Sequence, residues 1–182
     1  YNGFGTSNRG DMISTIKAVL LHPEARERTL ALDPSHGKLR EPIIRLMHLC
    51  RAFKLNSLRT YDWIYFNGLE DSILQAPYEY PSVFNFYRPD YSPNGEIDNL
   101  GLYAPEFQIN NDVSALHLAN AFNTLIYHGI VGGTTGNIGS KSYVGAVLNF
   151  DSEIAKSNNV QNLINHLNLI LCGGRLGPVT RQ

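Results

Sequence analysis

The sequence predicts an all-α protein, an irregular helical bundle crossed by long ordered loops. Three observations predict this class. Apolar residues recur at intervals of three and four along several segments, the period of one helix face. Capping residues and helix-stopping glycines or prolines bound these segments. A Pro- and aromatic-rich stretch (77–105) and a Gly-rich stretch (129–145) lie between them and predict loops, the second a mobile loop or a short hairpin.

The composition is that of a globular chain. Its 182 residues are 43% hydrophobic and 17% charged, with a formal net charge of -1. We expect one helical domain over residues 1–182, because a chain of this size can bury a core without a metal or disulfide. The near-zero charge argues against nucleic acid as a partner, since nucleic-acid domains are basic. No apolar run is long enough to predict a membrane span.

The first helical segment covers residues 11–21. Asp11 is a suitable N-cap, and His22-Pro23 ends the helix because a residue before proline avoids the helical conformation. Pro23 then suits the first turn of a short helix that extends to Arg26. The apolar stripe of the first segment consists of Ile13, Ile16, Val19 and Leu20.

The second helical segment covers residues 41–54 and has Pro42 near its start. Glu41 and Arg45 are four residues apart, which predicts an exposed ion pair. The apolar face consists of Ile43, Leu46, Met47, Cys50 and Phe53.

The third helical segment, residues 112–128, is predicted to begin at the cap Asn111 and to end at Gly129. Alanines on its apolar face predict a close approach to a neighbouring helix. That face consists of Ala115, Leu118, Ala119, Phe122, Leu125 and Ile126.

The fourth helical segment, residues 159–171, is capped by Asn158 or Asn159 and closed by Gly173. Pro178 is predicted to begin a further helix. The stripe of the fourth segment consists of Val160, Leu163, Ile164, Leu167 and Leu171.

The two cysteines, Cys50 and Cys172, both fall in apolar helical patterns. This placement predicts two small buried side chains. The alternative is a Cys50–Cys172 disulfide, which stabilises a protein by about 4 kcal/mol when it closes a loop of this length in an oxidising compartment.

Five strings are informative when they are read together: KAVLLHPEAR (17–26), KLREPIIRLMHLCRAF (38–53), PSVFNFYRPDYSP (81–93), APEFQI (104–109) and LNLILCGGRL (167–176). Their order and spacing resemble one bacterial family, known as domain of unknown function 1800. The resemblance implies a large, mostly helical protein that is commonly exported and often encoded beside a second exported protein. It carries no established activity. The chain is similar to the C-terminal part of the family, and the implied location is periplasmic or secreted.

The sequence matches known catalytic and cofactor-binding motifs only weakly. In Gly133–Lys141 the order Ser140-Lys141 is the reverse of a phosphate-binding loop, which argues against nucleotide binding. The helical histidines His48, His117 and His166 would bind a metal only if they converged; a lone helical histidine is more often hydrogen-bonded at a boundary. We therefore predict no metal and no cofactor.

The aromatic loop, residues 77–105, is the best binding candidate. Its rings offer flat apolar faces with polar edges, which suit sugar rings or a protein partner. The candidate binding residues are Tyr87, Arg88, Asp90, Tyr91, Glu41 and His48. In the structural alternative, Phe84 and Phe86 plug the bundle and Arg88 pairs with an acid such as Glu41.

Two functions remain open, and the sequence leaves it uncertain whether the protein is an enzyme. The first is a non-catalytic binding or scaffolding segment of an exported bacterial protein, with a polysaccharide or the co-encoded exported protein as partner. The alternative is the C-terminal part of a hydrolase-like enzyme whose site is completed by an N-terminal region. Its acid and base would come from the helical histidines and the carboxylates Glu41, Glu79, Asp90 and Glu106.

Overall fold

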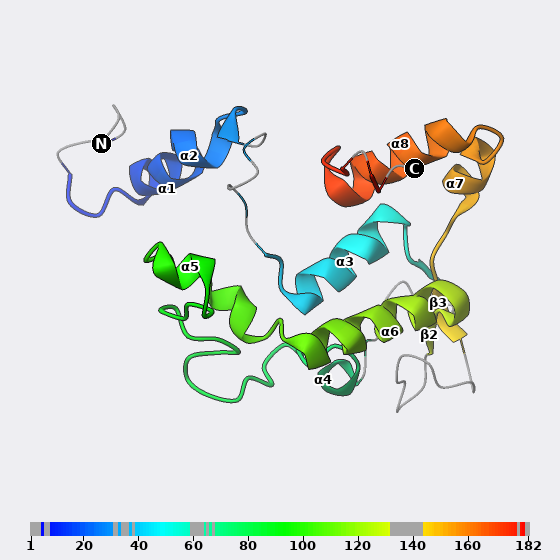
Figure 1. Cartoon of the computed structure of the whole chain (residues 1–182), viewed down its shortest axis with the longest axis horizontal. Helices are drawn as coiled ribbons and strands as arrows, with labels where there is room; N and C mark the ends of the chain where they lie inside the picture. The colour runs from blue at the N-terminus through cyan, green and yellow to red at the C-terminus, as the bar shows by residue number, and fades with distance from the viewer. Residues whose placement is uncertain are drawn as a thin grey trace. The chain divides into compact units, whose positions relative to one another are not determined.

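The computed structural model confirms a mainly helical protein. It describes residues 5, 8–30, 33, 37, 39–58, 64, 66, 68–131, 144–177 and 179–180. About 50% of the described residues are helical and 5% are in strands, and the helical residues include eight α-helices (Figure 1). The chain divides into two compact units, Tyr1–Lys38 and Leu39–Gln182.

The first unit contains the helices α1 (Met12–Leu20) and α2 (Pro23–Arg26), both where the sequence predicts them. Asp11 caps α1, since its Oδ1 accepts a hydrogen bond from the Ser14 N–H at 3.0 Å. Neither helix has a buried residue, so α2 does not cover the apolar stripe of α1.

The second unit is built on three longer helices. They are α3 (Pro42–Ala52), α6 (Asp112–His128) and α8 (Val160–Cys172). Helix α3 contacts α6 on one side and α8 on the other (Figure 1). The short helix α4 (Leu69–Ser72) packs on α6, and α7 (Asp151–Lys156) packs on α8. The fully buried side chains Leu46, Ile73 and Leu125 lie at the centre of this core.

The helix ends agree with the predicted caps. The Asn111 side chain accepts from the Ser114 N–H at 3.0 Å, and Asn159 accepts from the Asn162 N–H at the same distance. Gly173 ends α8 in the left-handed region at φ 60. Within α8 the predicted stripe is half-buried except for Val160, which is exposed. The predicted helix start Pro178 lies outside the described residues.

The predicted apolar face of α6 is wrong in part. Ala115, Ala119 and Ile126 are exposed, whereas Ser114 and Ala121 are buried with Leu118 and Leu125. Ser114 can be buried because its hydroxyl donates to the Asn111 carbonyl at 2.9 Å. The small residues on the buried face are therefore Ser114 and Ala121. The sequence pattern missed Ser114 because it counts only apolar residues as buried.

A small antiparallel sheet accompanies the helices, with strand order β1-β3-β2. Its strands are β1 (Asn56–Ser57), β2 (Ile130–Val131) and β3 (Val144–Val147). Strands β2 and β3 form the two ends of the Gly-rich stretch, which confirms the hairpin alternative for those ends. The residues between them, including the Gly133–Lys141 string, lie outside the described residues.

The aromatic loop is irregular over most of its length, as predicted. It contains a bridge between Ser82 and Asn85 and the short helix α5 (Glu96–Asn99), and it leads into a 3-10 helix at Pro105–Gln108. In the described part of the chain, no helix has both the length and the apolar character that crossing a bilayer requires.

Candidate functional site

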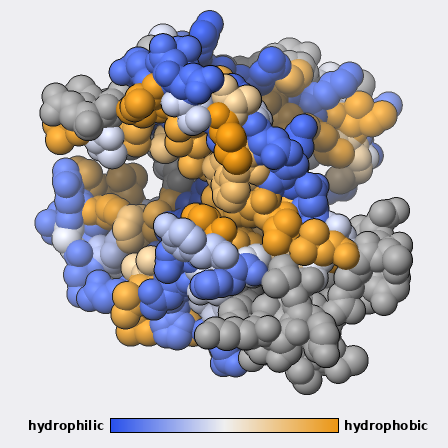
Figure 2. Space-filling model, turned by 90° about the vertical axis from the view of Figure 1, so that its right-hand side faces the viewer, coloured by the Kyte–Doolittle hydropathy of each residue, from blue (hydrophilic) through white to orange (hydrophobic). Residues whose placement is uncertain are grey.

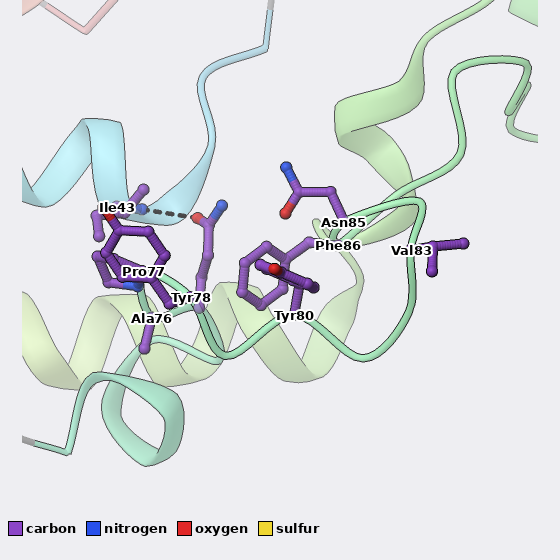
Figure 3. Close-up of a pocket in the computed structure, with 9 residues that line it drawn as sticks. Ile43, Ala76, Pro77, Tyr78, Tyr80, Val83, Asn85 and Phe86 are labelled. Atoms are coloured by element: carbon purple, nitrogen blue, oxygen red, sulfur yellow. Dashed lines mark hydrogen bonds between the residues drawn. The ribbon is translucent and has the colours of Figure 1, made fainter.

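An open groove of about 700 Å³ lies between the start of α3 and the first part of the aromatic loop (Figure 3). The described residues that line it are Ile43, Gln75, Ala76, Pro77, Tyr78, Tyr80, Val83, Asn85 and Phe86. Most are apolar or aromatic, and none of them carries a charge. The groove therefore suits an uncharged ligand with apolar faces, oriented by a few polar groups.

Gln75 is the buried polar residue of the groove, with 3% of its surface exposed. Its Oε1 accepts a hydrogen bond from the backbone N–H of Ile43 at 3.0 Å, drawn as the dashed line in Figure 3. Its Nε2 donates to Glu41. The N-cap residue of α3, Glu41, makes no side-chain capping bond, so Gln75 satisfies the first turn of α3 from a distant segment.

Glu41 also binds Tyr87, whose hydroxyl donates to it. Burial raises the pKa of Tyr87 to about 12, and the hydrogen bond and charge of Glu41 and the charge of Glu106 act in the same direction. The phenol is therefore protonated at neutral pH. Glu41 connects the start of α3 with both Gln75 and the aromatic loop.

The predicted partners of Glu41 are wrong. Glu41 pairs with neither Arg45 nor Arg88 in the described residues; the Nε of Arg45 donates to the carbonyl of Arg40 at 2.8 Å. Arg88 instead pairs with Asp90, two residues along the loop, with Nε–Oδ1 and Nη2–Oδ2 distances of 3.1 and 3.0 Å. Both side chains are largely exposed. A partner two residues away is available at little entropic cost, which favours the local pair.

The remaining candidate binding residues also lie outside the groove lining. Tyr91 is half-buried, and its carbonyl accepts from the Ala104 N–H at 2.9 Å. His48 lies on α3, where its Nε2 donates to the Ile170 carbonyl at 2.8 Å and its Nδ1 accepts from Arg40. Of the six predicted residues, Glu41 and Tyr87 reach the groove indirectly through Gln75.

The three helical histidines bind three different groups. His48 donates to the Ile170 carbonyl on α8. The Nδ1 of His117 donates to the Asp71 carbonyl at 2.9 Å. The Nε2 of His166 is 2.8 Å from Oε1 of Glu153, a carboxylate that is only 9% exposed. The described residues contain no group of three His, Cys, Asp or Glu side chains placed to hold a metal ion.

The two cysteines are free thiols, so the disulfide alternative is not formed in the structure. Cys50 is buried as predicted, and burial raises its pKa to about 11. Cys172 is exposed, which corrects the prediction that both are buried. It is the last residue of α8, where Gly173 turns the chain away and leaves the side chain uncovered.

Sequence reasoning missed two polar residues of the groove, Gln75 and Asn85. Nothing near Gln75 in the sequence indicates its role, because both of its partners lie more than thirty positions away. Asn85 has a positive φ of 69, a conformation that asparagine tolerates better than most residues. Tyr78 has a similar φ of 68, so the loop wall contains strained backbone.

The two predicted plug residues have different positions. Phe84 is 59% exposed, so it does not fill the bundle. Phe86 is half-buried and lines the groove. Since Phe84 and Phe86 are two positions apart in an irregular loop, the turn at Ser82–Asn85 decides which ring faces inward.

Hydrophobic side chains also reach the surface elsewhere. On the face shown in Figure 2 they gather in areas that border hydrophilic ones. On the aromatic loop, Leu100, Leu102 and Tyr103 are exposed, and none of the three lines the groove. The three residues cluster within four positions of the sequence. Apolar side chains that are exposed side by side are typical of contact surfaces for other molecules.

The model of one protein family, described as "Protein of unknown function (DUF1800)", matches residues 3–182. The match covers essentially the whole chain. No curated protein and no solved structure matches it.

Proposed function

Because the chain belongs to the DUF1800 family, whose description assigns no activity, we propose a function from the groove itself: a non-catalytic module that binds a polysaccharide. The observation that carries this proposal is the open groove of about 700 Å³ with aromatic walls, in which none of the described lining residues is charged. Sugar rings present apolar faces that stack on aromatic side chains, and their hydroxyls accept hydrogen bonds from amides.

The exposure of the groove tyrosines supports this proposal. Tyr78 is 91% exposed and Tyr80 is 52% exposed, so both rings are available to a ligand. Holding large aromatic side chains in water is unfavourable unless a partner covers them. Tyr78 is also held at a positive φ, and such strain persists only where the surroundings over-determine it, often at ligand sites.

The hydrolase alternative has less support. Acid–base hydrolysis of a glycosidic bond needs two carboxyl groups that flank the substrate. Among the described residues that line the groove there is no carboxylate. Glu41 is directed to Gln75 and Tyr87, and Asp90 is paired with Arg88.

The location outside the cytoplasm is part of the same proposal and rests on the export common to proteins that this chain resembles. A scaffolding contact with a second exported protein rests on a different observation, the exposed cluster Leu100, Leu102 and Tyr103. The two binding roles use separate surfaces, since none of these three residues lines the groove.

A glycan array followed by titration calorimetry tests the proposal, with Tyr80→Ala and Tyr103→Ala as a matched pair. Both tyrosines are exposed, but only Tyr80 lines the groove. We expect Tyr80→Ala to weaken glycan binding at least about tenfold, the effect of losing one stacked ring. Tyr103→Ala should leave glycan binding unchanged and weaken capture of the co-encoded protein. Equal effects of the two substitutions on glycan binding would show that the groove is not the glycan-binding site.

A further inference from the structure

We propose that the groove selects sugars that carry an amide, so that its polysaccharide is built from N-acetylated amino sugars. This inference rests on the proposed function and names its substrate class. Among the described lining residues, which are otherwise apolar or aromatic, the polar side-chain groups are the two amides of Gln75 and Asn85 and the tyrosine hydroxyls. Amides pair well with amides, because each offers both a donor and an acceptor.

The Gln75 amide is held in one orientation by two hydrogen bonds. Its Oε1 accepts from Ile43 at 3.0 Å, and one hydrogen of its Nε2 is donated to Glu41. A primary amide nitrogen has two hydrogens. The second N–H of Gln75 has no acceptor among the described residues. Although only 3% of Gln75 is exposed, the residue lines the groove, so we expect this N–H to meet the carbonyl of a ligand there.

The Asn85 amide is unpaired within the described residues and exposed. Its backbone is fixed, since its N–H donates to the Ser82 carbonyl at 3.0 Å and its φ is 69. Figure 3 shows its amide on the same side of the loop as the hydrogen bond between Ile43 and Gln75, whereas Val83 is directed away. A fixed backbone with a free amide presents a donor and an acceptor at one wall of the groove.

An acetamido group has the chemistry to pair with both amides. Its carbonyl can accept from the free N–H of Gln75, and its N–H can donate to Oδ1 of Asn85. Its methyl group requires an apolar surface, which Ile43 and Ala76 supply at the same wall as Gln75. A plain hydroxyl at this position leaves the amides partly unsatisfied, and sites built to hydrogen-bond a group discriminate strongly against analogues that lack it.

The described lining residues are all uncharged, which favours a neutral ligand. An N-acetylated sugar is neutral, whereas the deacetylated form carries an ammonium group that would be desolvated without a counter-ion. A polypeptide also has amides, but extended peptides are commonly read by an exposed strand edge. The described strands β1, β2 and β3 do not line the groove. The exposed tyrosine rings instead suit pyranose faces.

Calorimetric titration of the full chain with chitohexaose and cellohexaose tests this inference. The two sugars have the same β-1,4 linkage and differ in the acetamido or hydroxyl group at C2. We expect chitohexaose to bind at least about tenfold tighter than cellohexaose. In Asn85→Gly the preference should fall to within about twofold. Glycine is the matched replacement, because it adopts a positive φ without strain.

Each of the other possible results contradicts a specific statement of this inference or of the proposed function. If both sugars bind equally to the wild type and both weaken in Tyr80→Ala, the amide selectivity is wrong and the proposed function stands. If neither sugar binds, the amide selectivity is wrong, and the proposed function fails as well if no sugar on the glycan array binds. A preference for chitohexaose that survives in Asn85→Gly removes Asn85 from the site. Tighter binding of an extended peptide than of chitohexaose would replace the polysaccharide by a polypeptide. Tyr103→Ala serves as the folded control and should match the wild type for both sugars.

Discussion

Gln75 accepts a hydrogen bond from the backbone N–H of Ile43 at 3.0 Å, although the two residues are 32 positions apart. This bond fills the role that an N-cap side chain usually has in its own helix. It leaves Glu41, the residue at the cap position, free to accept from Gln75 and Tyr87. The same contacts that stabilise the start of α3 therefore hold one wall of the groove in place.

Replacement of Gln75 tests this arrangement. Gln75→Ala removes the cap and the hydrogen bond to a partly buried Glu41, so we expect the free energy of unfolding to fall by about 2–3 kcal/mol. Urea denaturation measures the change. Gln108→Ala is the control, because the Gln108 Oε1 also accepts one backbone N–H, that of Arg88 at 2.7 Å, but at an exposed position. Gln108→Ala should lower the free energy of unfolding by less than about 1 kcal/mol. Equal losses in the two variants would contradict the capping role of Gln75.

The stability of the protein should depend on Tyr87 at high pH. The pKa of Tyr87 is raised to about 12 in the folded protein, above the value of about 10 for an unperturbed tyrosine. A raised pKa means that the protonated phenol stabilises the fold. Its contribution is fully present below about pH 10 and is lost as the pH rises towards 12.

The variant Tyr87→Phe isolates this contribution. It should be less stable than the wild type at neutral pH by about 1 kcal/mol, and the difference should shrink between pH 10 and 12. Urea midpoints as a function of pH measure it for both proteins. Tyr103→Phe, at a residue that is 71% exposed, should follow the wild type throughout. Parallel curves for Tyr87→Phe and the wild type would show that the phenol makes no pH-dependent contribution.

The two thiols should differ in reactivity. Cys172 is exposed, whereas Cys50 is buried with its pKa raised to about 11, so little Cys50 thiolate exists at pH 8. We expect a thiol reagent to label one cysteine in the native protein and both in urea. Cys172→Ser should abolish native labelling, and Cys50→Ser should leave it intact. Protection of both thiols in urea without reductant would instead indicate a disulfide.

His166 should contribute more to stability than His117. His166→Ala leaves the buried carboxylate of Glu153 without its hydrogen-bond partner, at a cost of about 2–3 kcal/mol. His117→Ala loses a hydrogen bond to the Asp71 carbonyl at a more exposed position and should cost about 1 kcal/mol. Urea denaturation at pH 7 distinguishes the two, and a larger loss in His117→Ala would refute the ranking.

Little of the candidate site could be predicted from the sequence. The aromatic loop as the binding region, and Tyr78, Tyr80 and Phe86 within it, are visible in the composition. The polar pair Gln75 and Asn85 is not, because an isolated amide has no sequence signature. Arg88 and Asp90 looked like the polar anchors of the loop, but they satisfy one another at its surface.

The sequence by itself determined the helices α1, α2, α3, α6 and α8 and their ends, whereas its pattern does not predict the short helices α4, α5 and α7. The caps are local interactions: Asp11, Asn111 and Asn159 each bind a backbone N–H three residues ahead. Interactions of such short range are present in the linear pattern, whatever the rest of the chain does.

Only the tertiary structure decided which face of α6 is buried and which groups meet at the groove. Ser114 is buried because its hydroxyl is satisfied, and Gln75 caps α3 because helix packing brings two distant segments together. Nor does any local pattern indicate that His48 bonds the Ile170 carbonyl, 122 positions away. The physical reason is that hydrogen bonds between distant residues form only after the helices have packed, and their geometry depends on all the apolar contacts that fix that packing.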